Sequence, residues 1–402
     1  MKRYTLLFLI FLMINNPSIE AISKNHIINQ KIIYVDDDGV ANYTIIQDAI
    51  NNASDGDTIY VYSGLYCEHI IVNKSIILIG EDKNTTIIDG NHLENVINIF
   101  ADLVTIRGFT IKNCGENLIY TKNIIDTTIE IHSKNNTVFN NIITWDYFPG
   151  IYYNPVGIKI VLNSDNNEIY DNEILQCING MRIESSYNKI YNNMFEMNGA
   201  DGIKLFTSGP DVPYCSNNNI SNNSFYSINS KGYGLAIWGS HIQDNIILSN
   251  NIVDTYGGIH LEYSDNNLIL KNNLVNCVYW GISVADSDKN HILNNTISSV
   301  KKAGIYLGYG STKNLIQNNN ITNNKIGIYL TNNNRNRFYQ NNFINNRRQV
   351  KFALHSIFNH WKGNYWDNQL INGLPKILFG RFRRIIPWFN LDMHTAKKPY
   401  QI

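Results

Sequence analysis

One short pattern, a glycine followed by an apolar–x–apolar triplet, recurs eight times and limits what this chain can fold into. The copies begin at Gly157, Gly180, Gly202, Gly234, Gly258, Gly281, Gly304 and Gly327, so the spacing is 22 to 24 residues except for one interval of 32. Each copy continues with a polar turn containing Asn, a second apolar group and another Asn-rich turn. This alternation predicts three short strands per repeat and leaves no room for a helix. Because a unit this small cannot bury its own apolar face, the repeats must stack on one another.

The fold that such a stack predicts is all-β: a single right-handed parallel β-helix with three short strands per coil and about 23 residues per coil. The stretch from Thr128 to Ile143 supplies a ninth copy. The apolar residues of the triplets should form two inward-facing columns. These are Ile158, Met181, Ile203, Leu235, Ile259, Ile282, Ile305 and Ile328, and Ile160, Ile183, Leu205, Ile237, Leu261, Val284, Leu307 and Leu330.

Asparagine is the most distinctive component of the composition, with 65 residues out of 402. It is a poor former of helix interiors, but it tolerates the left-handed backbone of sharp turns, and its amide can both donate and accept hydrogen bonds. We therefore expect ladders of Asn side chains between successive coils. The candidate pairs are Asn192–Asn193, Asn222–Asn223, Asn250–Asn251, Asn272–Asn273, Asn294–Asn295 and Asn341–Asn342.

The N-terminus has the pattern of a secretory signal peptide. Lys2 and Arg3 precede an apolar run from Leu6 to Ile14, and a small residue suited to cleavage follows at Ala21. We assign residues 1–21 to this peptide, with an uncleaved anchor as the alternative. The protein is therefore expected to be secreted, extracellular or attached to the cell surface.

The two ends of the stack are expected to carry caps, since an open sheet end must be covered. Residues 32–58 form the N-terminal cap, with a helix that turns Ile45, Ile46, Ala49 and Ile50 to one side. The β-helix then occupies residues 59–346. Residues 347–402 form an irregular, basic and aromatic C-terminal cap or tail, with ten Lys or Arg against two acidic residues. This surplus of charge predicts attachment to an anionic envelope surface.

Several stretches resemble one known superfamily. They are the G-I-x-L repeats, the segment from Asp55 to Glu81 and the G-N-Y-W-D-N sequence at 363–368. Together they resemble secreted parallel β-helix proteins of the pectin-lyase-like superfamily, in particular CASH-domain and NosD-like periplasmic copper-binding proteins of the archaeal surface type. The resemblance covers nearly the whole mature chain and implies the fold. It does not select an activity, because this superfamily contains lyases, hydrolases, esterases, epimerases and binding proteins.

The outward positions of the repeats predict a ligand-binding surface. Lys159, Arg182 and Lys204 should stand on neighbouring strands, where like charges repel, and an anionic polysaccharide would relieve that repulsion. Aromatic rings nearby suit the apolar faces of sugars. We predict as substrate-binding residues Lys159, Lys204, Phe206, Trp238, Tyr306 and Tyr329. Alternatively, Glu130 and Glu184 screen the cations and the rings only cover the sheet.

Catalysis on this surface would use Arg182, Glu184, Asp201, His260 and Glu262. Glu184 with Arg182 and Lys204 could abstract a proton, and the Asp201–Gly202 pair is similar to the Asp-Gly of the superfamily's hydrolases. Superfamily lyases need carboxylates for calcium plus a basic group, and hydrolases need paired carboxylates at set separations. The sequence shows neither set in full. The function expected is thus polysaccharide binding, with lyase or hydrolase activity left open. The alternatives are a structural or adhesive spacer, or a copper-handling accessory protein.

No cofactor is predicted, although the resemblance leaves copper or calcium open. Copper delivery would favour clustered His, Met or Cys, whereas the ten His are scattered and the five Cys show no C-x-x-C. The acidic run Asp36–Gly39 lacks the ligand spacing of a calcium loop. With 33 basic and 33 acidic residues, nucleic acid is not an expected partner. A cell-wall glycan is, and we expect a monomer whose loops at 145–155 and between Gly202 and Gly234 border the cleft.

Overall fold

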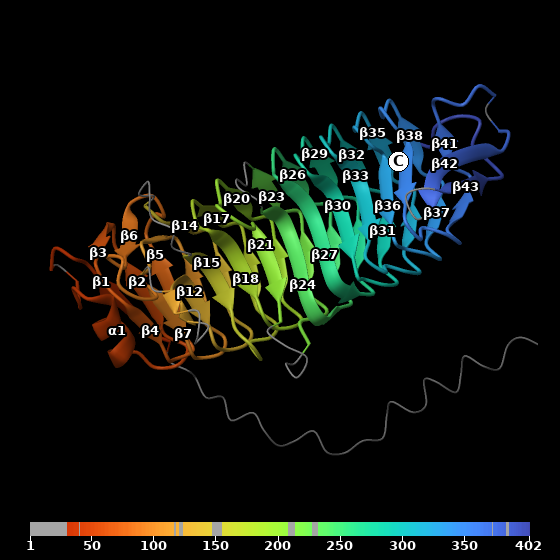
Figure 1. Ribbon diagram of the computed structural model, residues 1–402. Helices are drawn as coiled ribbons and strands as arrows, with labels where there is room; N and C mark the ends of the chain where they lie inside the picture. The colour runs from red at the N-terminus through yellow and green to blue at the C-terminus, as the bar shows by residue number, and fades with distance from the viewer. Residues whose placement is uncertain are drawn as a thin grey trace, which may run out of the picture.

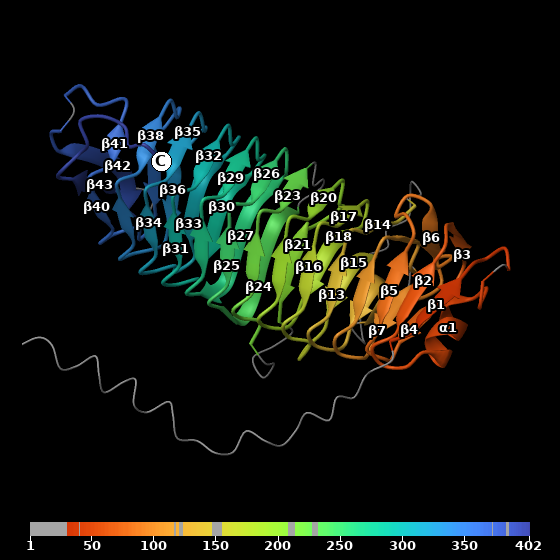
Figure 2. The same ribbon diagram turned by 180° about the vertical axis from the view of Figure 1, so that it is seen from behind.

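The computed structural model describes residues 30–39, 41–115, 118–119, 124–146, 155–207, 214–226, 232–371, 373–382 and 386–402. The predicted signal peptide lies outside these residues, as do most of the predicted loop at 145–155 and two stretches between Gly202 and Gly234. The described chain forms one elongated stack of coils, running from the N-terminal end in orange to the C-terminal end in blue (Figures 1 and 2). This confirms the predicted β-helix.

Three parallel sheets run along the stack, and each coil contributes one strand to each of them in turn. Sheet 1 carries the glycine repeats and has 12 strands. They are β4 (Ile70–Val72), β7 (Ile97–Ile99), β12 (Thr127–Ile131), β15 (Val156–Ile160), β18 (Asn179–Ile183), β21 (Ile203–Phe206), β24 (Tyr233–Gln243), β27 (Gly257–Asp265), β30 (Trp280–Ala285), β33 (Ala303–Gly308), β36 (Ile328–Thr331) and β39 (Val350–Ala353).

Sheet 2 follows sheet 1 in each coil and has 16 strands. They are β1 (Ile32–Val35), β2 (Thr58–Val61), β5 (Ile77–Gly80), β8 (Thr105–Arg107), β13 (Thr137–Phe139), β16 (Glu168–Tyr170), β19 (Lys189–Tyr191), β22 (Asn219–Ser221), β25 (Ile246–Leu248), β28 (Leu268–Leu270), β31 (His291–Leu293), β34 (Leu315–Gln317), β37 (Arg337–Tyr339), β40 (His360–Lys362), β43 (Ile386–Asp392) and β42 (Lys376–Phe382).

Sheet 3 completes the coil with 13 strands. They are β3 (Gly64–Tyr66), β6 (Thr86–Asp89), β9 (Thr110–Lys112), β14 (Ile142–Thr144), β17 (Glu173–Leu175), β20 (Met194–Glu196), β23 (Ser224–Tyr226), β26 (Asn251–Val253), β29 (Asn273–Val275), β32 (Thr296–Ser298), β35 (Asn320–Thr322), β38 (Asn342–Ile344) and β41 (Tyr365–Trp366). A separate antiparallel pair joins β10 (Leu118–Ile119) to β11 (Ile124–Ile125).

The register of sheet 1 confirms both inward columns. Ile158 pairs with Met181 and Met181 with Ile203, and every residue of the two columns is fully buried. Because successive side chains of a strand point to opposite faces, the residue between two core positions points out of the stack. The core between the three sheets is therefore continuous from one end of the molecule to the other.

Two Asn ladders hold the corners of the coils. At the corner from sheet 2 to sheet 3, the backbone N–H of each Asn donates to the side-chain oxygen of the Asn one coil further on, at 2.9–3.1 Å. This ladder consists of Asn141, Asn172, Asn193, Asn223, Asn250, Asn272, Asn295, Asn319, Asn341 and Asn364. It contains one member of each predicted pair, so the predicted ladder is confirmed.

The other member of each pair has a different role. Asn192, Asn222 and Asn294 have φ near +55°, and they make the sharp turn before the ladder residue. Asn251 and Asn273 instead begin strands of sheet 3, where the side chain of the second donates to that of the first at 2.8 Å. One Asn of each pair therefore belongs to the ladder, and the other either makes the turn before it or begins the next strand.

A second ladder at the corner from sheet 1 to sheet 2 was not predicted. Its backbone-to-side-chain hydrogen bonds measure 2.8–3.0 Å. Its members are Asn136, Asn167, Asn188, Asn218, Asn245, Asn267, Asn290, Asn314, Asn336 and Asn359. Six of these ten Asn residues follow other residue types and only four follow an Asn, so Asn pairs mark this corner in the sequence only irregularly.

The ends of the stack are covered. At the N-terminus, helix α1 (Ile46–Asn52) buries Ile46, Ala49 and Ile50. The prediction for Ile45 was wrong: its side chain is 45% exposed, because it precedes the helix with an extended backbone. At the C-terminus the expected irregular cap includes a regular antiparallel hairpin, β42–β43. Among the described residues, no helix is long and apolar enough to cross a membrane.

Candidate functional site

The outward side chains of sheet 1 form two columns with the register that the sequence predicts. Lys159, Arg182 and Lys204 are paired on neighbouring strands, and Phe206 pairs with Trp238 one coil further on. Ten of the eleven predicted site residues lie in these columns: Lys159, Arg182, Glu184, Lys204, Phe206, Trp238, His260, Glu262, Tyr306 and Tyr329. The eleventh, Asp201, comes just before β21.

Two of the three cations are neutralised by neighbouring carboxylates. Lys159 Nζ lies 2.7 Å from Glu130 Oε1, and His132 Nε2 lies 3.1 Å from Glu130 Oε2. Burial opposes the ionisation of Glu130, but these hydrogen bonds outweigh it and lower the pKa of Glu130 to about 2. Arg182 forms an ion pair with Glu184 on the same strand. The screening alternative therefore holds for Lys159 and Arg182.

Lys204 differs from its two neighbours. Its Nζ lies over two rings, 5.3 Å from the centroid of Phe206 and 4.9 Å from that of Trp238. No ion pair of the described residues includes it. Burial lowers the pKa of Lys204, with a smaller opposing effect from Asp201. Lys204 is therefore a partly desolvated cation that lies over two aromatic rings, and Trp238 remains 40% exposed beside it.

Next to Lys204, a cluster of titratable groups extends over three coils. Asp201 Oδ1 accepts a hydrogen bond from the backbone nitrogen of Tyr233 at 2.8 Å. The ring of Tyr233 stacks on His260 with the centroids 4.6 Å apart, and His260 Nε2 lies 3.2 Å from Glu262 Oε2. His260 Nδ1 is buried without a hydrogen-bond partner. Nε2 of this imidazole is thus oriented by Glu262, whereas Nδ1 makes no hydrogen bond to the described residues.

Burial perturbs the proton affinities in this cluster. It raises the pKa of both Asp201 and Tyr233. The hydrogen bond from His260 lowers the pKa of Glu262 against a smaller opposing effect of burial. Several perturbed groups gathered on one surface are a property of functional sites, although ion-pair networks can produce it too.

The sequence analysis missed Tyr233, which links Asp201 to His260. It belongs to a third outward position, the residue directly before each repeat glycine, which also contains Asp201 and Trp280. Strict alternation does not predict this position, because it lies three residues before the x residue and a period of two would place the two on opposite faces. The two surface columns predicted from the sequence contain the residues two and four positions after each glycine.

The aromatic end of the surface is more closed than predicted. Tyr306 is only 7% exposed, since its ring stacks on Trp280 with centroids 4.5 Å apart and lies 5.7 Å from the ring of Tyr329, which also lies near Trp280. Lys351 Nζ covers Tyr329 at 4.4 Å, and Lys302 Nζ lies 4.2 Å from the ring of Trp280. Tyr306 therefore has no free ring face for a sugar, because the packing between coils uses it.

The described residues do not fit a copper site. They contain no group of three or more His, Cys, Asp or Glu side chains that could hold a metal ion. Burial raises the pKa of Cys177, Cys215 and Cys277, the last to about 11, so these thiols remain protonated and packed in the core. Thiolate ligands for copper are not available there.

Comparison with known proteins agrees with this architecture. Residues 75–241 match the family model of the right-handed β-helix region, and residues 202–370 match that of the periplasmic copper-binding protein NosD. The chain is a right-handed parallel β-helix protein. A cell surface glycoprotein of Methanothermus fervidus is 30% identical over 304 residues, which are 69% of this chain and 48% of the relative. The β-helix protein thus spans about half the length of this curated relative.

Solved structures share the fold of the β-helix protein at low identity. The catalytic unit of a GH87 α-1,3-glucanase from Streptomyces thermodiastaticus superimposes with a TM-score of 0.66 at 14% identity, covering 79% of this chain and 64% of that one. A PL6 alginate lyase in complex with a trisaccharide gives 0.64 at 13% identity, covering 90% and 92%. Identities this low establish the fold and leave the chemistry to the residues of this chain.

Proposed function

We propose that this β-helix protein works outside the cytoplasmic membrane and binds an acidic polysaccharide along the outer face of sheet 1. The observation that carries the proposal is Lys204, a cation that forms no ion pair with the described residues and lies over the rings of Phe206 and Trp238. A uronate carboxylate would supply the missing charge, and Trp238 would cover the apolar face of the sugar ring. The alginate lyase of the same fold, bound to a trisaccharide, supports this ligand class.

If the protein also acts on its ligand, a lyase reaction suits the cluster better than hydrolysis. Lys204 would pair with the uronate carboxylate and stabilise the negative charge that develops there, while His260, whose Nδ1 makes no hydrogen bond to the described residues, would accept the proton from the neighbouring carbon. Tyr233, whose pKa burial raises, remains protonated and can supply a proton to the departing sugar oxygen. The two carboxylates that hydrolysis would need, Glu184 and Glu262, are engaged by Arg182 and His260.

A comparison of two lysines tests the binding. Lys204→Met should weaken the binding of uronic-acid oligosaccharides roughly tenfold or more, as measured by calorimetry. The matched control is Lys159→Met, which removes a lysine already neutralised by Glu130 and should leave the affinity within about threefold. Equal effects of the two changes would contradict the proposal. Lyase activity would appear as absorbance from new carbon–carbon double bonds, and its absence with intact binding would leave a lectin-like protein.

The alternatives make different predictions. A spacer without a ligand would bind no glycan in an array. A copper-handling accessory protein would retain stoichiometric copper after dialysis, which the donor set of the described residues disfavours. Either result would replace polysaccharide binding as the leading function.

We further propose that the C-terminal hairpin attaches the protein to an anionic envelope surface. Support comes from its outer side, where cross-strand pairs Ile377–Leu391 and Phe379–Phe389 are each 40% to 69% exposed. Lys376, Lys397 and Lys398 belong to the same segment. Exposed apolar and basic side chains together are typical of segments that bind at lipid interfaces. Phe379→Ser should abolish co-sedimentation with anionic vesicles, and unchanged sedimentation would contradict this attachment.

A further inference from the structure

Each corner from sheet 1 to sheet 2 uses one residue in the left-handed conformation. It directly precedes the Asn of the second ladder, and its φ lies between +55° and +62° in every coil from Asn135 onward. These residues are Asn135, Asn166, Tyr187, Asn217, Asp244, Asn266, Lys289, Lys313, Arg335 and Phe358. Asn and Asp accept this conformation readily, whereas a bulky aromatic residue rarely does. Tyr187 and Phe358 are therefore the two aromatic exceptions, each with a local conformational cost, and of these two Tyr187 lines a cavity of about 330 Å³ that includes Asp165, Tyr214 and Ser216.

Tyr187 forms part of the wall of a cavity at this corner, away from the outer face of sheet 1. The cavity has a volume of about 330 Å³ and extends over four successive coils. Small-molecule pockets have volumes of roughly 300–1,000 Å³, so it can hold one or two sugar units. Tyr187 and Tyr214, 56% and 54% exposed, are its aromatic residues, and Asp165, Gln243 and Asp244 contribute polar groups.

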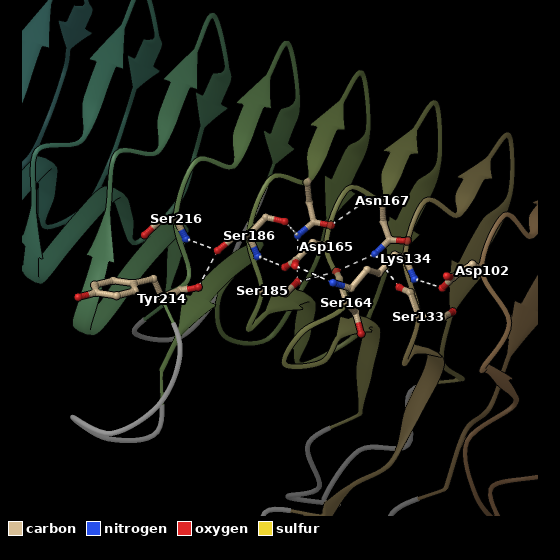
Figure 3. Close-up of polar contacts among 11 residues, drawn as sticks. Asp102, Ser133, Lys134, Ser164, Asp165, Asn167, Ser185, Ser186, Tyr214 and Ser216 are labelled. Atoms are coloured by element: carbon tan, nitrogen blue, oxygen red, sulfur yellow. Dashed lines mark hydrogen bonds and ion pairs between the residues drawn. The ribbon is translucent and has the colours of Figure 1, made fainter.

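A polar network fixes the floor of this corner (Figure 3). Asp165 Oδ1 accepts from the backbone nitrogen of Ser186 at 3.0 Å, and Lys134 Nζ lies 3.3 Å from Asp165 Oδ2. Ser186 Oγ donates to the carbonyl of Tyr214 at 2.6 Å and accepts from the nitrogen of Ser216 at 3.0 Å. The polar groups of the floor are thus held by neighbouring coils before any ligand arrives.

One polar group in the cavity has no partner. Ser216 is only 4% exposed, and its Oγ makes no hydrogen bond to any residue that the structure describes. Leaving a buried hydroxyl unsatisfied costs stability, so such a group in a cavity wall calls for an explanation. A ligand hydroxyl in the cavity would satisfy it.

We propose that this cavity, the corner pocket, binds a neutral sugar unit. Two exposed phenol rings, two carboxylates, amide side chains and an unpaired serine hydroxyl are the groups that bind vicinal hydroxyls and the apolar face of a pyranose ring. The pocket differs in charge from the site on sheet 1. Its lining residues include Asp165 and Asp244 but no Lys or Arg, and the nearby Lys134 is already paired with Asp165, so the lining offers no cation to a uronate. The corner pocket is therefore independent of the acidic-polysaccharide site.

Tyr187→Asn tests the pocket without disturbing the turn. Asn occupies the same left-handed position in the neighbouring coils at Asn166 and Asn217, so the variant should fold with a melting temperature equal to or above that of the parent protein. We expect full-length protein to bind hexamers of neutral hexoses, and the variant to lose roughly tenfold or more of that affinity. Phe358→Asn makes the same change at the same turn position in another coil and should leave the affinity unchanged.

Ser216→Ala separates a binding role from a structural one. Because it removes an unsatisfied buried hydroxyl, this variant should raise the melting temperature slightly while weakening hexamer binding several-fold. Uronic-acid oligosaccharides should bind both pocket variants as they bind the parent protein, so failure of this proposal and of the sheet 1 proposal can be distinguished. The corner pocket would be refuted if no neutral hexamer bound at about 10 mM, a concentration that detects even millimolar affinities, or if both variants bound it normally. Binding of calcium alone would refute it as well.

Discussion

Asn364 donates to the carboxylate of Asp392 twice, from its backbone nitrogen at 3.1 Å and from its side-chain amide at 2.9 Å. Every Asn in this ladder accepts from the preceding coil and donates to the next one, so the final Asn needs a partner that only accepts. Asp392 meets that need from the terminal strand β43, and it also accepts from Trp366 Nε1 at 3.1 Å and from the nitrogen of Gly363. The carboxylate of Asp392 thus accepts the last hydrogen bonds of this Asn ladder at the C-terminal end of the stack.

Replacing Asp392 by Asn should therefore destabilise the C-terminal coils. The new amide nitrogen would face donors that now reach a carboxylate oxygen, and an unsatisfied buried group costs about 1–3 kcal/mol. Denaturant unfolding followed by the fluorescence of Trp361 and Trp366 would measure this loss. Asp171→Asn is the control, because Asp171 occupies an exposed turn where the next coil has Asn192. A D392N protein as stable as the parent would contradict the closing role.

The interior of the ladder makes a second prediction. Asn250 accepts from Asn223 at 3.0 Å and donates to Asn272 and to the carbonyl of Ile220. Asn250→Ala removes the acceptor of the Asn223 backbone nitrogen and amide and the side-chain donor to the Ile220 carbonyl, while the backbone nitrogen of residue 250 still donates to Asn272, so we expect a loss on the order of 3 kcal/mol. Asn251→Ala, at the partly exposed start of β26, should cost about 1 kcal/mol or less.

Hydrogen exchange would locate that loss. Since each coil contacts only its neighbours, exchange should accelerate most in the coils next to Asn250 and little at the ends. Uniform acceleration along the whole chain would mean that the stack unfolds as one unit.

The features that the sequence predicted are those that repeat with the coil. Strict alternation fixes Ile158 inside and Lys159 outside once the 23-residue period is known, so the core columns and the surface register follow from the pattern. The second Asn ladder also repeats, but a variable residue such as Tyr187 or Lys289 precedes its Asn and hides the pattern.

The sequence does not predict which neighbouring side chains contact one another. The pattern does not show that Lys159 pairs with Glu130 whereas the Nζ of Lys204 lies over two aromatic rings. Both lysines stand two residues after a repeat glycine. Tyr306 was predicted as a sugar platform from its column, but Trp280, one coil away at another position, covers it. Side-chain direction decides these contacts, and the repeat does not encode it.

The ion pair between Glu130 and Lys159 gives a prediction of pH dependence. The pKa of Glu130 is about 2 in the folded protein against an ordinary value of 4.5, so folding favours the ionised form. Its contribution to stability is fully present above pH 4.5 and is lost as the pH falls toward 2. A shift of this size corresponds to roughly 3 kcal/mol.

Chemical denaturation at pH 6, 4 and 2.5 would test this dependence. Glu130→Gln keeps a side chain that can accept a hydrogen bond from Lys159 but cannot titrate, so its stability should fall less steeply across this range. A variant with the same slope as the parent protein would show that other carboxylates carry the acid sensitivity.

Gly257 tests how the cluster beside Lys204 is held together. The ring of Tyr233 lies directly over this glycine, and a Cβ there would be 2.3 Å from the ring carbons. Gly257→Ala must therefore displace the ring of Tyr233 and break its 4.6 Å stack on His260. Because the backbone of Gly257 is ordinary extended strand, the fold should persist. We expect uronic-acid oligosaccharides to bind several-fold more weakly, and the ring-current shift on the His260 imidazole protons to disappear from the NMR spectrum. Tyr233→Phe keeps the ring and should preserve both, whereas an unchanged His260 signal in G257A would show that the stack does not depend on this contact.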